Sequence, residues 1–435
     1  MYRRVAKAAV RWGRDPYFGF VPGPDHLPPE ALETLRPLVG VEDGKSVERF
    51  EEAFASLIGE GECVSFAAAR MGFHSILRVR GVGPGDEVVL PGATCSVMVN
   101  AVLRVGAKPV FADIDPETFG SSAEGIEKVL SDATRVVVAQ HSFGIPCDIA
   151  PIVRLARERG LFLVEDCALA LDSRRDGRVV GSFGDAAIFS TDHSKPLNTI
   201  IGGLLYSTDP ALIEMVRRFQ REAPPLSPPV QWELWRRLLL ERSYCTPSRY
   251  GRMEAVAIFE SVRKRLLQRP SPVSGDDASS SPVAEDPFYP AKMPPFLARL
   301  GVLELGRWQE KRAARRRVFG DLLEALRRTP VARHLPAAYA DPALEITPLR
   351  LVWSQPDGDR LRGRMERFLE VGWTWFMTPI VSTREPLTNY GYVAGSCPLS
   401  ERLGSGMVNL PCILPERHFG ALRERVIASA GAEDR

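Results

Sequence analysis

Three side chains near the middle of the chain have types and spacing that could carry chemistry: Asp166, Ser190 and Lys195. Asp166 ends the apolar run LFLVED, Ser190 ends the run AAIFS, and Lys195 follows in the loop TDHSKPLN. If both runs are neighbouring parallel strands, the three side chains project from one edge of one sheet. A lysine amine can form a Schiff base with an aldehyde, a carboxylate can pair with a pyridine nitrogen, and a hydroxyl can donate to a phosphate. The set suits a ligand that carries all three groups.

Each of these residues also has an ordinary interpretation. An aspartate at a strand end often caps a turn, and a lysine in a loop is usually solvated. To react, Lys195 has to be a neutral amine, although the unperturbed pKa of lysine is about 10.4. A desolvated pocket or a nearby cation would lower that pKa. The pattern of residues alone leaves both interpretations open.

The segment that must position these residues runs from 86 to 207, where short β-rich runs alternate with helical stretches. This alternation is typical of parallel strands covered by helices. The apolar run VVVA at 136–139 fits a sheet that is buried on both faces. We therefore expect an α/β fold with a mainly parallel sheet, and a ligand beyond the carboxyl ends of its strands.

The rest of the chain divides into further units. We expect a large domain with an extra N-terminal segment, an insertion with amphipathic helices and a disordered linker, a long linking helix and a small C-terminal α/β domain; these cover 1–220, 221–288, 289–334 and 335–435 in turn. The inserted helices at 231–240 and 256–268 mix Trp, Leu and Arg. They could lie on a membrane surface, although a lid or a dimer-packing element is the favoured interpretation.

Composition narrows the class of protein. The chain has 435 residues, 45% of them apolar and 25% charged, as in soluble globular proteins. Its net charge of +2 gives no argument for a nucleic-acid partner. The seven cysteines are scattered without a C-x-x-C pair, which indicates neither a disulfide framework nor a metal site. With no recognisable signal peptide and no apolar run long enough to span a bilayer, a cytoplasmic protein is expected.

Residues 44–207 resemble the DegT/DnrJ/EryC1/StrS family, the sugar aminotransferases of the type I pyridoxal-phosphate (PLP) fold. The resemblance is carried by GKSVERFEEAFA, GVGPGDEVVLPGATCSVMVNAVLRVGAKPVFADIDPETF, HSFGIPCDI, LVEDCALA and GSFGDAAIFSTDHSKPLNTIIGG. Two later stretches, RLGVLELGRWQEKRAARR and VNLPCILPERHF, resemble the family's linking helix and its C-terminal segment. From Asp166 through Lys195 to Gly203 the register holds without a gap.

This resemblance implies roles for the three residues. Lys195 would be the Schiff-base lysine and proton shuttle, Asp166 would pair with the pyridine nitrogen, and Ser190 would contact the phosphate. The implied reaction is amino transfer from glutamate, or a similar amino acid, to a keto group of a nucleotide-linked deoxysugar in polysaccharide or glycosylated-metabolite biosynthesis. Family enzymes are homodimers with active sites at the subunit interface.

Several positions of the expected cofactor pocket depart from the family pattern. Ala69 and Arg70 stand where the family usually has a Gly-Thr pair that holds the phosphate. Arg70 could bind the phosphate through a charge-assisted bond, or could be a surface arginine. Cys95 stands where an aromatic residue usually covers the cofactor ring, and Leu169 stands where a Gln or His is common.

Three further residues are candidates for the substrate or partner side of the site. Lys292 keeps a cation where the family has an Asn-x-Arg pair that reaches the partner subunit, whereas Pro290 keeps no donor. His141 follows a buried strand and could approach the site or be structural. His193 precedes Lys195 by two residues and could titrate there, with a solvent-facing side chain as the simpler interpretation.

These departures keep two other functions open. The chain could be a non-catalytic relative that binds a sugar nucleotide, a partner subunit or a membrane surface. It could also catalyse a different PLP reaction, such as an elimination, on a similar sugar.

Overall fold

The computed structural model describes residues 16–21, 27–266, 289–383 and 385–431. Its α-helices are α2 (Pro29–Leu35), α3 (Gly44–Ile58), α4 (Ala69–Val79), α5 (Ser96–Arg104), α6 (Ala123–Glu127), α7 (Ile149–Glu158), α8 (Pro210–Glu222), α9 (Pro228–Tyr244), α10 (Met253–Leu266), α11 (Pro295–Gly306), α12 (Trp308–Arg327), α13 (Gly358–Met365), α14 (Pro398–Gly406) and α15 (Phe419–Ala430). Its strands are β1 (Glu62–Phe66), β2 (Glu87–Pro91), β3 (Thr94–Cys95), β4 (Lys108–Ala112), β5 (Thr134–Gln140), β6 (Phe162–Asp166), β7 (Arg174–Arg175), β8 (Arg178–Val179), β9 (Ala186–Ser190), β10 (Gly203–Ser207), β11 (Leu344–Glu345), β12 (Arg350–Ser354), β13 (Ile380–Val381) and β14 (Met407–Pro411).

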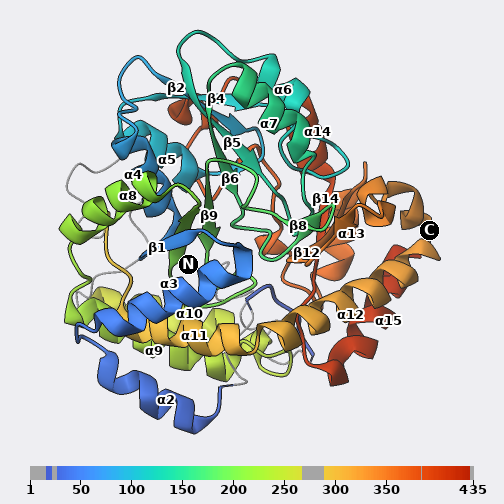
Figure 1. The fold of residues 1–435 in the computed structure, drawn as a ribbon. Coiled ribbons are helices and arrows are strands. Elements are labelled where there is room, and N and C mark those ends of the chain that lie inside the picture. The colour runs from blue at the N-terminus through green and yellow to red at the C-terminus, as the bar shows by residue number, and fades with distance from the viewer. Residues whose placement is uncertain (1–15, 22–26, 267–288, 384, 432–435) are drawn as a thin grey trace.

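A seven-stranded sheet forms the centre of the molecule, in the order β1-β10-β9-β6-β5-β2-β4 (Figure 1). The run β9-β6-β5-β2-β4 is parallel, whereas β10 is antiparallel to both of its neighbours. The predicted α/β fold with a mainly parallel sheet is thereby confirmed.

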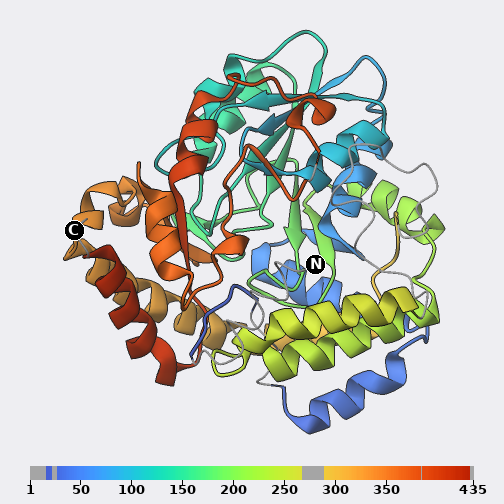
Figure 2. The same cartoon turned by 180° about the vertical axis from the view of Figure 1, so that it is seen from behind.

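The sheet is buried on both faces because its side chains alternate between two apolar cores. On β5, Val136 and Val138 belong to one core, and Val137 and Ala139 to the other. Helices α4, α5 and α8 contribute to the first core, and α6 and α7 to the second (Figures 1 and 2). A strand with two buried faces reads as a continuous apolar run, as VVVA does.

A separate core lies C-terminal to the linking helices, where the sequence predicted a smaller unit. The antiparallel pair β12 and β14 packs there with α12, α13 and α15. Phe18 and Phe20 from the N-terminal segment join the same core. The N–H of Phe18 donates to the carbonyl of Phe368 at 2.8 Å, which ties the start of the described chain to this unit.

The prediction of one long linking helix is wrong. Two helices, α11 and α12, occupy this stretch and are separated at Arg307, whose φ of −110° and ψ of 9° are not helical. Helix α11 packs along α3 of the large unit, whereas α12 packs against α15 and β12. Gly306, the last residue of α11, lowers the helix propensity next to the break.

The insertion contains the two predicted helices, α9 and α10 (Figure 2). Val230, Leu234 and Leu238 lie on one side of α9 and pack into the main core. The predicted linker at 270–287 lies outside the described residues. Within the described part of the chain, none of the helices has the length and apolar character needed to cross a bilayer. Contact with a membrane surface stays a prediction.

Candidate active site

A cavity of about 540 Å³ opens at the carboxyl ends of β5, β6 and β9. This volume lies in the range of roughly 300–1,000 Å³ that is common for small-molecule sites. Asp166 and Ser190 end β6 and β9, which are adjacent, and both line the cavity together with Lys195. The structure thus brings together the three residues singled out in the sequence.

Lys195 lies in the loop between β9 and β10, with its Nζ 5.9 Å from the centre of the Trp375 ring. Burial lowers the pKa of Lys195, and the carboxylates of Asp192 and Asp166 act in the opposite direction. A lowered pKa favours the neutral amine, which is the nucleophilic form.

Asp166 is 5% exposed and accepts a hydrogen bond at 2.9 Å from the backbone N–H of Ala168. Burial raises the pKa of Asp166, against the effects of that hydrogen bond and of Lys195. A carboxyl group with a raised pKa can still pair with a pyridine nitrogen, because the pair needs only one proton between the two atoms.

The first turn of α4 forms another part of the lining, through Ala69 and Arg70. Among the described residues, no side chain caps the start of this helix. Gly203 at the start of β10 permits the close approach, because a Cβ there would clash with the backbone of Ala69. A helix N-terminus favours an anion, and an arginine strengthens that preference.

Cys95 and Leu169 also line the cavity, where the family pattern has an aromatic and a polar residue. Cys95 belongs to β3, which pairs in parallel with β13 of the C-terminal part of the chain. Trp375, five residues before β13, lines the same cavity. An aromatic ring is therefore present, but it comes from a distant segment.

Sequence reasoning missed other polar residues of the lining, among them Gln140, Asp192 and Arg350. Gln140 ends β5 and donates from Nε2 to the carbonyl of Ala93 at 2.8 Å, so its position at a strand end could have revealed it. Arg350 begins β12 and donates to Oδ1 of Asn409 at 2.9 Å. Burial lowers its pKa to about 10. No local pattern points from Arg350 to this cavity.

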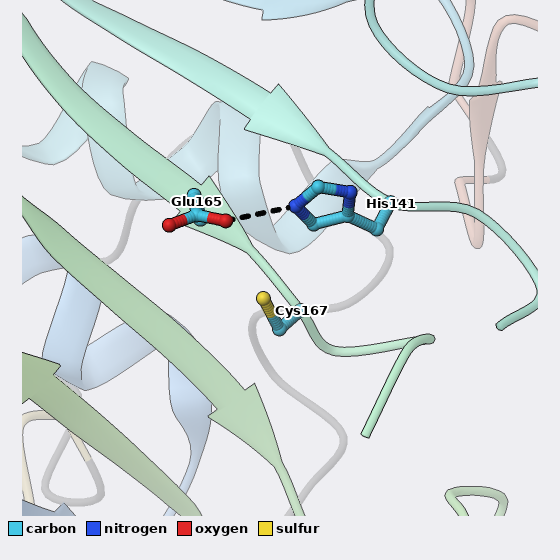
Figure 3. Close-up of side chains that lie close together, drawn as sticks. All are labelled: His141, Glu165 and Cys167. Carbon is cyan, nitrogen blue, oxygen red and sulfur yellow. Dashed lines mark hydrogen bonds and ion pairs between the residues drawn. The ribbon is translucent and has the colours of Figure 1, made fainter. Parts of the chain in front are cut away.

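His141 is not among the described residues that line the cavity. It is fully buried, its Nδ1 accepts from the N–H of Cys147 at 3.1 Å, and its Nε2 donates to Glu165 at 3.0 Å (Figure 3). Glu165 also accepts backbone N–H groups from Gly181, Phe183 and Gly184. This arrangement fits the structural interpretation of His141.

Cys167 lies close enough to His141 and Glu165 for the three side chains to be considered as metal ligands (Figure 3). The hydrogen bonds just described already engage both ring nitrogens of His141 and both carboxylate oxygens of Glu165. The cluster therefore holds the loop that begins at Gly181 against the end of β6.

Of the two remaining candidates, His193 and Lys292, only the first lines the cavity in the described part of the chain. His193 lines the cavity beside Lys195. Lys292 does not belong to the described lining, and its backbone N–H donates to the carbonyl of Pro224 at 3.1 Å. Contact between Lys292 and a partner subunit stays a prediction.

Comparison with known proteins finds similarity to aminotransferases in each case. A family model described as the DegT/DnrJ/EryC1/StrS aminotransferase family matches residues 30–225. GDP-perosamine synthase of Escherichia coli O157:H7 is 35% identical over 177 residues, which cover 41% of this chain and 49% of that protein. The L-glutamine:2-deoxy-scyllo-inosose aminotransferase of Streptomyces fradiae is 38% identical over 179 residues, covering 41% and 42%. The chain thus spans about half the length of the curated relatives that it matches.

Solved structures match over almost the whole chain. The aminotransferase TlmJ from Streptoalloteichus hindustanus has a TM-score of 0.69 at 24% identity, with 95% of this chain and 98% of that one covered. The aminotransferase PseC of Helicobacter pylori has a TM-score of 0.70 at 16% identity, with 95% and 99% covered. These matches establish the shared fold, and the family model and the relatives show that residues 30–225 of this chain are similar to the DegT/DnrJ/EryC1/StrS aminotransferase family.

Proposed function

We propose that this protein is a PLP-dependent aminotransferase that transfers an amino group from an amino acid, such as glutamate, to a keto group of a nucleotide-linked deoxysugar. One observation carries the proposal: Lys195 and Asp166 line one cavity at the carboxyl edge of the sheet. Aminotransferases of this family depend on PLP.

The residues of the cavity fit PLP at three points. Lys195 suits the aldehyde, Asp166 suits the pyridine nitrogen, and the first turn of α4 with Arg70 and Ser190 suits the phosphate. When bound, PLP accepts electrons from the carbon that loses a proton. The departures at Ala69 and Arg70 therefore keep a site for an anion.

Lys195 can perform two tasks in this reaction. As a buried amine with a lowered pKa, it can form the covalent bond that holds the cofactor. With PLP bound, the same Nζ would move a proton between the substrate carbon and a neighbouring atom. Asp166 keeps a proton at the pyridine nitrogen throughout, because it pairs with that atom.

One wall of the cavity, formed by the C-terminal part of the chain, suits the substrates. Arg350 is a buried cation in that wall, and a guanidinium binds a carboxylate through paired hydrogen bonds. This arrangement supports an amino-acid donor. The name of one relative, GDP-perosamine synthase, supports a nucleotide-linked sugar as the acceptor. The predicted homodimer and the predicted cytoplasmic location stay predictions.

A second candidate is a PLP enzyme that catalyses a different reaction on a similar sugar, such as an elimination. Leu169 favours this candidate, because it makes the cavity less polar than the family pattern. Analysis of the sugar product by mass spectrometry distinguishes the two, since an aminated sugar requires amino transfer and a deoxygenated sugar requires elimination.

The visible absorption spectrum with and without glutamate tests the main proposal. Purified protein with PLP should show the visible band of a lysine-bound cofactor, and glutamate should shift this band to the ultraviolet. Lys195→Ala should lose the visible band, whereas Lys292→Ala should keep it, because Lys292 lies outside the described lining of the cavity. A wild-type protein that stays colourless with added PLP would disprove the proposed function.

A further inference from the structure

The inserted helix α9 reaches the loop that carries Lys195. Nδ1 of His193, two residues before Lys195, lies 3.0 Å from Oε1 of Glu241 and 2.7 Å from Nη2 of Arg237. Nε of Arg237 donates to the same Oε1 at 2.8 Å. A carboxylate, a guanidinium and an imidazole thus meet where α9 touches the edge of the proposed cofactor site.

Glu241 is held there as a charged group. Its side chain is 1% exposed, and burial acts to raise the pKa of its carboxyl. The nearby His193 and Arg237 outweigh that effect and lower the pKa below its usual value. An ionised carboxylate in such a place is costly unless it is paired, so the three groups depend on one another.

The helix that presents Glu241 is fixed in the main core. Leu238 and Leu234, one and two turns earlier on α9, are fully buried in it. Gln231, near the start of the helix, accepts from the N–H of Gly40 at 3.0 Å. Glu241 is therefore presented by a rigid element.

Nδ1 of His193 can bond to α9 in either tautomer of the ring. When Nδ1 carries no hydrogen, it accepts from Arg237, and when it carries one, it donates to Glu241. The attachment of the loop to α9 is therefore retained in both tautomers.

A movement of His193 would reach Lys195 through a short hydrogen-bonded turn. The N–H of Lys195 donates to the carbonyl of Asp192 at 2.9 Å, and the N–H of His193 donates to the carbonyl of Ile200 at 3.2 Å. Asp192 faces His193, Arg237 and Lys195, and these neighbours lower the pKa of its carboxyl against the effect of burial. The turn and the inserted helix thus form one charged unit.

We propose that Glu241 and Arg237 of the inserted helix α9 are positioning residues for Lys195, so that the insertion is an integral part of the cofactor site. The inference rests on the proposed function, because the position of the Lys195 amine affects activity only if PLP attaches to it covalently. A shift of about 1 Å in a reacting group is enough to cost up to roughly a hundredfold in rate.

The first experiment compares Glu241→Gln with a matched change on the same helix, Glu233→Gln. Glu233 pairs with Arg263 of α10, away from the lysine loop. The dissociation constant of PLP and the pH midpoint of the visible band are measured for both variants. Glu241→Gln should weaken PLP binding about tenfold, as expected for a lost charged hydrogen bond, and should shift the midpoint. Glu233→Gln should match the wild type in both.

The second experiment does not depend on PLP. The rate at which an amine-selective acylating reagent modifies Lys195 is followed by peptide mass spectrometry, with Lys292 as an internal reference. Glu241→Gln should change the Lys195 rate several-fold. Arg237→Lys, which keeps the cation at a side chain that is 30% exposed, should give a smaller change in a protein that still folds.

The two experiments distinguish a failure of the proposed function from a failure of the inference about α9. A colourless wild type would disprove the proposed function, and the modification rates would still decide whether α9 positions Lys195. The inference is overturned if Glu241→Gln and Arg237→Lys both match Glu233→Gln in the rate at Lys195. It is also overturned if the wild type binds PLP and the midpoint is the same in all variants.

Discussion

Two walls of the cavity differ in how they relate to the family. The strand-end wall consists of Asp166 and Ser190, which end β6 and β9, and of Lys195 in the loop after β9. All three lie in the stretch that the family model matches. The C-terminal wall consists of Arg350 and Trp375, which lie beyond residues 30–225, the stretch that the family model matches. The first wall suits the cofactor, whereas in the second wall Arg350 suits a substrate and Trp375 suits the cofactor ring. The proposed chemistry therefore rests mainly on the first wall, and substrate binding on Arg350 of the second.

The largest effect is expected in the strand-end wall. Asp166→Asn should lower kcat by about a hundredfold or more, because a neutral amide cannot keep the pyridine nitrogen protonated. PLP should still bind, since Lys195 remains. Steady-state kinetics with glutamate and a keto-sugar measure the change, and an unchanged kcat would remove Asp166 from the proposed mechanism.

A pH dependence tests the same wall. Burial lowers the pKa of Lys195 from its ordinary value of 10.5, so the neutral amine appears at a lower pH than on an exposed lysine. The rate of PLP uptake by the apoprotein should rise with pH by about tenfold per unit and level off below 10.5. Stopped-flow absorbance measures this rate. A plateau only at or above 10.5 would contradict a desolvated lysine.

A change in the C-terminal wall should act on binding. Arg350→Met should raise the KM for the amino donor about tenfold, the size expected for a lost charge-assisted hydrogen bond. The KM for the keto-sugar and the PLP affinity should change little. If the keto-sugar KM rises instead, Arg350 serves the acceptor, and the assignment of this wall to the donor is wrong.

The smallest effect is expected for Trp375, whose ring lies 5.9 Å from Nζ of Lys195. Trp375→Phe keeps an aromatic face and should change PLP affinity little, whereas Trp375→Ala should weaken it about threefold. Titration of the visible band measures both. Equal affinities for all three proteins would show that the ring does not compensate for Cys95.

The strand-end wall could be predicted because it follows from local patterns in the sequence. Apolar runs predict buried strands, and parallel strands bring their carboxyl ends to one edge. The sequence therefore predicts that Asp166 and Ser190 lie together. The same reasoning leaves His141 either near the site or structural, because the last residue of a strand and the residue after it can face different sides of the sheet.

The C-terminal wall and the contacts of α9 could not be predicted in this way. Arg350 and Trp375 line the cavity although they come from the C-terminal part of the chain. Likewise, β3 pairs with β13 across nearly three hundred residues of sequence. The break at Arg307 could not be predicted either, and it separates a helix that packs along α3 from one that packs against α15 and β12. The periodicity of apolar residues describes one helix or strand at a time and does not show how distant elements pack together.

The sequence by itself determined the order of strands and helices and the identity of the residues at the strand ends. These follow from local patterns of apolar and polar residues. Only the tertiary structure decided which distant side chains complete the cavity, and that Glu241 of the insertion touches the turn of Lys195. Such contacts depend on how separate cores pack together, which is a property of the whole chain.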